Sequence, residues 1–232
     1  MNSIRIWPRQ FADGRPNVVS RRPRKIERKL SRLRYWPWFR AKQFTTDWAS
    51  EHFTLWHRVL SPLRKKPLRI LEIGSWEGRS ALFFLNFFPR ATITCIDTFE
   101  GGHDEHKDWA SKLPNIEKRF DHNLAPFGSR AEKLKCLSQE GLRWLGEQQR
   151  RYDLAYIDGS HVPDDVMADS IGVWSVIEPG GVIIWDDYKL GVVHGNLPLD
   201  QRPQSAIDAF LSKQSYRLLA KGYQMIIEKR DQ

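Results

Sequence analysis

Acidic residues stand directly after several short apolar runs, in positions from which their side chains could do chemistry. They are Asp97, Asp158, Asp186 and Asp187, and Ser138 follows a further run of the same kind. Short runs rich in β-branched residues are typical of strands buried on both faces of a parallel sheet. Because the carboxyl ends of parallel strands meet at one edge, where such sheets bind ligands, we expect these side chains to gather there.

Three of the carboxylates, Asp158, Asp186 and Asp187, would lie at the ends of neighbouring strands about 5 Å apart. Like charges this close repel one another, so either some of the groups stay protonated or a cation neutralises them. An all-oxygen site with open positions suits Mg²⁺. The ion would bind a substrate hydroxyl and lower its pKa, which makes an oxygen nucleophile at neutral pH. Capping a helix or a turn is the alternative role for each Asp taken singly.

A glycine turn joins the apolar run 70–73 to a helix expected over 80–88. The spacing of Glu72, Gly74 and Gly78 differs from the G-x-G-x-x-G pattern of dinucleotide sites, which weakens a dehydrogenase interpretation. Glycine lets a backbone approach a ligand closely, and the helix N-terminus beyond it suits an anionic group. Asp97 would end the next strand, where a carboxylate can accept hydrogen bonds from both ribose hydroxyls. A cap or a turn is again the alternative.

Strands and helices alternate along the chain, which predicts an α/β fold. The expected strands are 70–73, 91–96, 132–137, 152–157, 182–185, 216–220 and 224–228. The expected helices are 80–88, 116–124, 141–149, 166–177 and 206–211, after a helix capped by Thr45 to Asp47 that runs to about Leu60. A sharp turn is expected at 179–181, and loops at 98–114 and 191–203. We predict a Rossmann-like, doubly wound, seven-stranded and mostly parallel sheet of order 3-2-1-4-5-7-6, with one antiparallel end strand.

The composition indicates one packed domain with an appended basic arm. Hydrophobic residues make up 41% of the 232 residues, and no apolar run approaches the roughly 20 residues of a membrane helix. The N-terminus lacks the apolar core of a signal peptide, so we expect a cytoplasmic protein. Cys95 and Cys136 fall in apolar runs, which favours reduced thiols over a disulfide or a metal site.

The positive charge is concentrated in the first 42 residues, which hold 13 Lys and Arg against two acidic residues. We therefore divide the chain into a basic N-terminal arm, 1–44, partly disordered or docked on the body, and a catalytic domain, 45–232. The arm combines basic and aromatic residues. It could dock on the body, make a weak contact with an anionic membrane surface, or, as the least favoured alternative, bind nucleic acid.

The segments 68–99 and 134–188 resemble the class I S-adenosylmethionine-dependent methyltransferases. Within that class they resemble the metal-dependent O-methyltransferases, both the catechol type and the bacterial sugar and macrolide type. The resemblance covers over half of the chain and rests on the order and spacing of the motifs. It implies that Asp158, Asp186 and Asp187 hold the metal, and that Asp97 binds the ribose of S-adenosylmethionine.

Further cofactor contacts follow from the same resemblance. Glu72, Gly74 and Ser80 match positions near the methionine part, and the pair Ser138-Gln139 resembles a pair that flanks adenine in catechol O-methyltransferase. The whole expected cofactor set is Glu72, Gly74, Ser75, Trp76, Gly78, Ser80, Asp97, Thr98, Phe99, Ser138, Gln139 and Asp158.

His161 is the residue that we expect to act as the catalytic base, although catechol enzymes carry Lys at this position. The sugar enzymes carry Asp where this chain has Ser160. An imidazole with an ordinary pKa near 6.5 accepts a proton at neutral pH. The alternative for His161 is a hydrogen bond to Asp158 that orients the carboxylate.

These features predict Mg²⁺-assisted O-methylation of a small hydroxylated acceptor, such as a sugar or a glycoside. A metal-independent methyltransferase, a hydroxylase-like relative with iron on the same fold, and a nucleic-acid-binding protein without activity are the alternatives.

Overall fold

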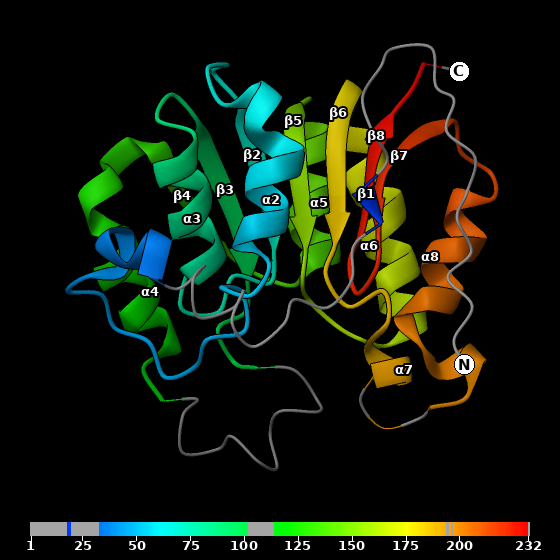
Figure 1. Cartoon of the computed structure of the whole chain (residues 1–232), viewed down its shortest axis with the longest axis horizontal. Coiled ribbons are helices and arrows are strands. Elements are labelled where there is room, and N and C mark those ends of the chain that lie inside the picture. Colours follow the sequence, from blue (N-terminus) through cyan, green and yellow to red (C-terminus); the bar gives the residue numbers. More distant parts are fainter. Residues whose placement is uncertain (1–17, 20–32, 102–113, 194, 196, 232) are drawn as a thin grey trace.

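A sheet of mostly parallel strands runs through the middle of the computed structural model, which describes residues 18–19, 33–101, 114–193, 195 and 197–231 (Figure 1). Within these residues the strands are β1 (Val18–Val19), β2 (Arg69–Ile73), β3 (Thr92–Asp97), β4 (Ala131–Lys135), β5 (Tyr152–Ile157), β6 (Ile177–Trp185), β7 (Tyr216–Lys221) and β8 (Met225–Lys229). They are ordered β1-β7-β8-β6-β5-β2-β3-β4. Without the two-residue β1, this is the predicted order 3-2-1-4-5-7-6.

One strand runs against the others. β8 pairs antiparallel with both β6 and β7, whereas the pairs among β2, β3, β4, β5 and β6 are parallel. The antiparallel strand is the last in the chain, and it lies between β6 and β7. The predicted doubly wound fold is confirmed, and the strand order reverses between β2 and β5, where such sheets bind ligands.

Helices cover both faces of the sheet (Figure 1). The described helices are α2 (Phe53–Leu60), α3 (Arg79–Phe87), α4 (Ile116–Leu124), α5 (Ser138–Glu147), α6 (Pro163–Val176), α7 (Leu190–Val193) and α8 (Pro203–Leu211), with 3₁₀ turns η1 (Ser61–Leu63), η2 (Ala125–Arg130) and η3 (Leu199–Gln201). One apolar core lies under α2 and α3, where Trp56, Phe83 and Phe84 are fully buried. The other lies under α5, α6 and α8 and includes Leu145 and Val173.

Gly74 is required where β2 meets the end of β5. Its φ is +77°, and a Cβ at this position would lie 2.0 Å from the backbone oxygen of Asp158. The neighbouring backbone bond from Asp158 N to Ile73 O is 2.8 Å long. The structure shows that Gly74 makes room for the adjacent strand end, and its close approach to a ligand stays a prediction.

Three expected segments differ from the structure. The helix expected from Thr45 begins only at Phe53, because the Asp47 carboxylate binds Arg79 at 2.8 Å and accepts the backbone N–H of Ser50 at 3.1 Å, which holds this segment in turns. The turn expected at 179–181 lies inside β6, which begins at Ile177 and shifts its register against β5 there. The expected loop 191–203 contains most of α7 and the turn η3.

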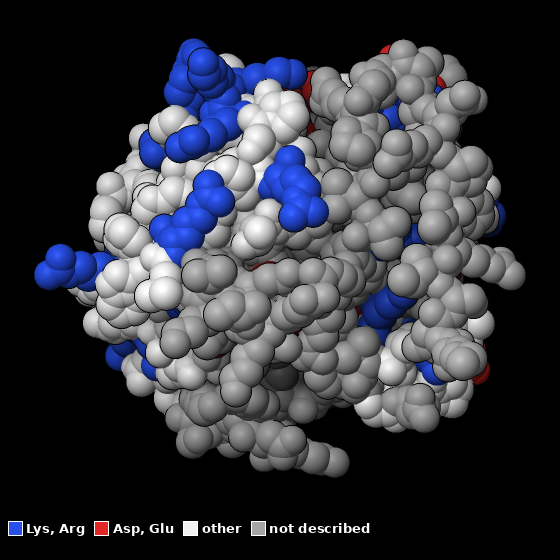
Figure 2. Space-filling model, viewed as in Figure 1, with Lys and Arg blue, Asp and Glu red and all other residues white. Residues whose placement is uncertain are grey.

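The described parts of the arm both contact the body: residues 18–19 pair as β1 with β7, and residues 33–44 pack on the core. Residues 33–39 are helical, with Tyr35 and Phe39 buried in the core under α2 and α3. Leu33 and Trp36 are exposed on the same helix. In Figure 2, Lys and Arg side chains gather on this face of the molecule. The boundary between residues 44 and 45 stays a prediction.

Some predictions concern residues outside the described ranges, namely most of residues 1–24 and most of the loop expected at 98–114. Among the described helices, none combines the length and the apolar character needed to cross a bilayer. The cytoplasmic location stays a prediction.

Replacing Gly74 by Ala should lower the free energy of unfolding by about 3 kcal/mol or more, because a left-handed φ and a backbone collision add up. Gly180→Ala is the matched control, since Gly180 has the same φ of +77° and nothing within 4 Å of its Cβ position. It should cost only about 1–2 kcal/mol. Urea unfolding of the two variants measures the difference, and equal losses would contradict this account of Gly74.

Candidate functional site

The backbone ladder brings two acidic strand ends side by side. Asp158 N donates to Ile73 O at 2.8 Å, and Asp186 N donates to Ile157 O at 3.0 Å. These bonds continue the parallel ladders of β2 with β5 and of β5 with β6 by one residue. Asp158 and the Asp186-Asp187 pair therefore leave the sheet at the same edge, as the sequence predicted.

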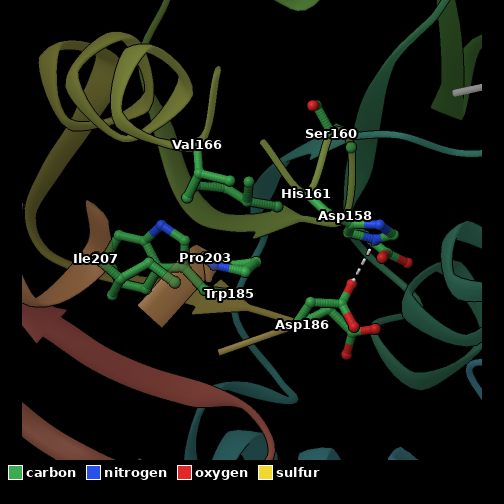
Figure 3. A pocket seen from close by; sticks show the side chains of 11 residues that line it. Asp158, Ser160, His161, Val166, Trp185, Asp186, Pro203 and Ile207 are labelled. Atoms are coloured by element: carbon green, nitrogen blue, oxygen red, sulfur yellow. Dashed lines mark ion pairs between the residues drawn. The ribbon is translucent and has the colours of Figure 1, made fainter. Parts of the chain in front are cut away.

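Asp158, His161 and Asp187 form a compact cluster. One nitrogen or oxygen atom from each lies within 4.8 Å of the others, and His161 Nε2 is 3.0 Å from Asp187 Oδ2. Figure 3 shows the carboxylates and the imidazole turned toward one another, away from the apolar side chains of Val166 and Ile207. A pocket beside the cluster is lined by these groups and by Trp185 and Pro203, among others.

Two tyrosines donate hydrogen bonds to this cluster. Tyr156 OH donates to Asp158 Oδ2, and Tyr223 OH donates to Asp187 Oδ1, each at 2.8 Å. Burial, followed by the nearby carboxylates, raises the pKa of both hydroxyls, so they remain donors at neutral pH. One oxygen of Asp158 and one oxygen of Asp187 therefore each accept a hydrogen bond from a tyrosine hydroxyl.

Asp186 faces a different set of partners, although it is adjacent to Asp187. Its Oδ1 accepts a hydrogen bond from Gln224 Nε2 and lies 3.6 Å from His52 Nε2. Both residues lie beyond the last residue of β6, and the two carboxyl groups have different partners. Asp186 is 6% exposed and lines the pocket together with Asp158, His161 and Asp187.

The three carboxyl groups differ in protonation. Burial and the charges of Asp186 and Asp187 raise the pKa of Asp158 well above its usual range. Burial likewise raises the pKa of Asp186 to about 6. Burial acts on Asp187 in the same direction, but the His161 hydrogen bond and charge outweigh it and lower the pKa. A cation at this edge of the sheet would favour ionisation of the carboxyl groups whose pKa is raised. Carboxylate oxygens are also the donors that suit Mg²⁺.

Asp97 lies against the glycine turn. Its Oδ2 accepts the backbone N–H groups of Ser75 and Trp76, both at 2.7 Å, and its Oδ1 accepts that of Phe99 at 2.6 Å. Trp76 and Phe99 both have positive φ values, of 47° and 57°. The carboxylate therefore holds two strained turns together at the place where a ribose was expected.

Glu72 is the most deeply buried acid beside the turn. It is 0% exposed, and its Oε1 has no hydrogen-bond partner among the residues that the structure describes. Burial raises its pKa to about 7. A buried carboxyl with an unpaired oxygen suits a ligand ammonium group, and the methionine part of S-adenosylmethionine carries one.

The remaining expected cofactor residues follow the carboxyl ends of β2, β3 and β4. Ser80 is buried in the first turn of α3, whose N-cap is Gly78 with φ +78°. Thr98 follows β3 and accepts the backbone N–H of Glu100 at 3.3 Å. Ser138 and Gln139 open α5 after β4, and Gln139 is exposed.

Sequence reasoning missed the residues that complete the site from outside the strand ends. They are His52 immediately before α2, Tyr223 and Gln224 between β7 and β8, and Glu77 within the glycine turn. The sequence offered no signal for them, because their partners lie far along the chain; Tyr223 and Asp187 are 36 residues apart.

Glu77 fastens the segment before α2 to the glycine turn. Its carboxylate accepts Thr45 N at 2.6 Å and Thr45 Oγ1 at 2.7 Å, and it pairs with Arg119 of α4. The Trp48 ring packs 5.3 Å from the Trp76 ring, between centroids. The turn and the segment that carries His52 are therefore one connected unit.

Comparison with known families gives a match over the region that carries the strand ends. A family model described as a methyltransferase domain matches residues 71–188, half of the chain. Mycinamicin VI 2''-O-methyltransferase of Micromonospora griseorubida is 24% identical over 147 residues, which are 60% of this chain and 31% of that protein. Demethylmacrocin O-methyltransferase of Streptomyces fradiae is 24% identical over 156 residues, or 63% and 34%. The chain thus spans about a third of the length of these relatives.

Solved structures share the fold. The MycE methyltransferase from the mycinamycin biosynthetic pathway, in complex with Mg, SAH and mycinamycin VI, matches with a TM-score of 0.55 and 20% identity over 89% of this chain and 55% of that one. An O-methyltransferase from Bacillus cereus in complex with SAH matches with a TM-score of 0.56 and 17% identity over 90% and 92%. At these identities the likeness shows the fold alone.

The buried Glu72 predicts a pH-dependent cost to the ligand-free chain. Its pKa is raised from 4.5 in the unfolded chain to about 7, so stability due to the neutral form is full below pH 4.5 and is lost as the pH rises to 7. As the pH rises over this range, the free energy of unfolding of Glu72→Gln should come to exceed that of the wild type by up to about 3 kcal/mol. Urea unfolding at pH 4.5, 6 and 8 measures this gain. A difference that does not change with pH would contradict the assignment.

Proposed function

Since the chain belongs to the methyltransferase family matched over residues 71–188, we propose that it transfers a methyl group from S-adenosylmethionine to a hydroxyl oxygen of a small acceptor, with a sugar or glycoside preferred. The observation that carries the proposal is the gathering of Asp158, His161 and Asp187 at the strand ends next to the glycine turn. The relatives named for macrolide and mycinamicin methylation support this acceptor class.

S-adenosylmethionine supplies the activated methyl group, and the residues around the glycine turn would hold it. We assign the ribose hydroxyls to Asp97 and the ammonium group to Glu72, whose Oε1 is buried without a partner in the described part of the chain. The other expected contacts of this cofactor are Gly74, Ser75, Trp76, Gly78, Ser80, Thr98, Phe99, Ser138, Gln139 and Asp158.

The carboxylates of Asp158, Asp186 and Asp187 would hold Mg²⁺, whose chemistry is to polarise the acceptor hydroxyl and lower its pKa. The protein's own part is to keep these oxygens together despite their repulsion, through Tyr156 and Tyr223. Mg is also present in the MycE complexes, which supports this assignment.

His161 would accept the proton of the acceptor hydroxyl. Its ring is 30% exposed, so a substrate can reach it, and Asp187 at 3.0 Å would stabilise the imidazolium that forms. A role as a metal ligand is the alternative. Iron sites of the two-His, one-carboxylate kind are a poorer fit, because the described cluster has one histidine.

Methyl transfer from radiolabelled S-adenosylmethionine to a panel of glycosides tests the proposal. We expect activity that disappears with EDTA and returns with added Mg²⁺. His161→Ala should lower kcat by roughly 10²–10⁴-fold while SAH affinity stays near that of the wild type. His122→Ala, which removes an exposed histidine of α4, is the control.

Each outcome separates one part of the proposal from the rest. Full turnover in EDTA would favour a metal-independent methyltransferase. Wild-type turnover in His161→Ala would remove His161 from the mechanism, and loss of Mg²⁺ affinity in that variant would make it a ligand instead.

A weak contact with an anionic membrane is a second proposal, for the face shown in Figure 2. Arg34 and Arg64 both lie near His57. The exposed cations along the chain beside them are Arg58, Lys65 and Lys66. No ion pair is formed by these five side chains within the described ranges. The helix 33–39 adds the exposed side chains of Leu33 and Trp36 beside them. Apolar and cationic side chains together suit a lipid interface better than nucleic acid. The cations include residues just before β2, at the opposite end from the catalytic edge, so bound protein would keep its site accessible.

Lys65→Gln with Lys66→Gln should weaken binding to phosphatidylserine-containing vesicles by about 30-fold, at about 1 kcal/mol per cation. Lys213→Gln, an exposed lysine after α8, should change binding little. Cosedimentation at low salt measures both. Binding to duplex DNA with no preference for anionic vesicles would favour nucleic acid instead.

A further inference from the structure

Three buried side chains from distant parts of the chain form a hydrogen-bonded line that ends at the active-site edge. Trp56 Nε1 of α2 donates to Gln224 Oε1 at 2.8 Å, and Gln224 Nε2 donates to Asp186 Oδ1. Trp56 and Gln224 are both 0% exposed. The mechanism above uses Asp186 but neither of the other two.

The direction of the line is fixed by chemistry. An indole nitrogen can only donate, so the Gln224 atom that faces Trp56 must be the amide oxygen. The amide nitrogen then faces the carboxylate of Asp186, to which it can donate. A reversed amide would put oxygen against oxygen at Asp186 and a donor against a donor at Trp56.

A second contact reaches the same carboxylate oxygen. His52 Nε2 lies 3.6 Å from Asp186 Oδ1, and the His52 ring stacks on Tyr223 at 5.7 Å and 10°. Within the described ranges, no hydrogen bond is formed to Asp186 Oδ2. The surrounding protein thus holds one oxygen of Asp186, and the side chain also lines the pocket beside Asp158, His161 and Asp187.

We propose that Gln224 is a positioning residue for Asp186, and that Trp56 fixes the orientation of its amide. Gln224 would act on Mg²⁺ only through the carboxylate of Asp186, whose Oδ1 it binds. The proposal rests on the proposed function, because it assigns Gln224 a role toward the same metal site.

Stability alone does not account for this arrangement. An apolar side chain of similar volume fills a buried position without the cost of burying an amide, and such replacements are often neutral or stabilising. We therefore expect the loss of these hydrogen bonds to change the affinity for Mg²⁺ more than it changes the free energy of unfolding.

Calorimetry of Mg²⁺ binding to the SAH-loaded full chain tests the proposal. Gln224→Met keeps the volume and removes the donor, and it should weaken Mg²⁺ binding by about 10–100-fold, as loss of a group that orients a ligand does. Trp56→Phe should cause a smaller loss. In the double variant, Trp56→Phe should add nothing to the effect of Gln224→Met, because Trp56 acts through the amide.

Ser170→Ala is the matched control. It also leaves a buried indole without its acceptor, since Trp185 Nε1 donates to Ser170 Oγ at 2.9 Å, but the Ser170 hydroxyl makes no contact with a carboxylate in the described ranges. Its Mg²⁺ affinity should equal that of the wild type. Affinity for SAH is measured for every variant, and unchanged affinity shows that the SAH-binding part is folded. If Gln224→Met fails this check, Trp56→Phe still tests the hydrogen-bonded series Trp56-Gln224-Asp186.

Mg²⁺ affinity of Gln224→Met within twofold of the wild type, with SAH affinity intact, would overturn the positioning role and leave the proposed function standing. A wild-type chain that binds SAH but no Mg²⁺ would instead overturn the metal part of the proposed function, and this inference with it. Additive losses in the double variant would overturn the role of Trp56.

Discussion

Repulsion among carboxylates at one edge of a parallel sheet is the constraint around which this site is built. Oxygen atoms of Asp158 and Asp187 come within 4.8 Å of each other. At an effective dielectric constant near 20, two full charges at this distance repel by about 3 kcal/mol. The parallel registers of β2, β5 and β6 impose the closeness, so the chain must offset the repulsion with donors from elsewhere.

Those donors come largely from outside the region that the family model matches. His52 precedes residue 71, and Tyr223 and Gln224 follow residue 188, yet all three contact the Asp186-Asp187 pair. The matched region supplies the acids, and the helix before it and the hairpin after it supply the groups that hold them. Glu77 in the glycine turn also binds Thr45. This contact connects the turn to the segment that carries His52.

The sequence predicted what depends on local pattern and on the common direction of strands. Apolar runs located the strand ends, and parallel pairing then placed Asp97, Asp158 and Asp186 at one edge. It could not predict how neighbouring side chains divide their partners. Asp187 faces His161 and Tyr223, whereas Asp186 faces Gln224, and these partners come from segments that only the tertiary fold brings together. The glycine turn at Gly74 was also predicted, but nothing in the sequence indicated that the backbone of Asp158 takes the space beside it.

Counting bound divalent ions tests most directly whether the carboxylates gather to share one cation. Mn²⁺ can replace Mg²⁺ as the probe, and electron paramagnetic resonance measures the free ion as it is titrated into the SAH-loaded chain. The account predicts one tightly held ion per wild-type chain and none in Asp158→Asn. Equal binding by the two proteins, or no binding by the wild type, would contradict it.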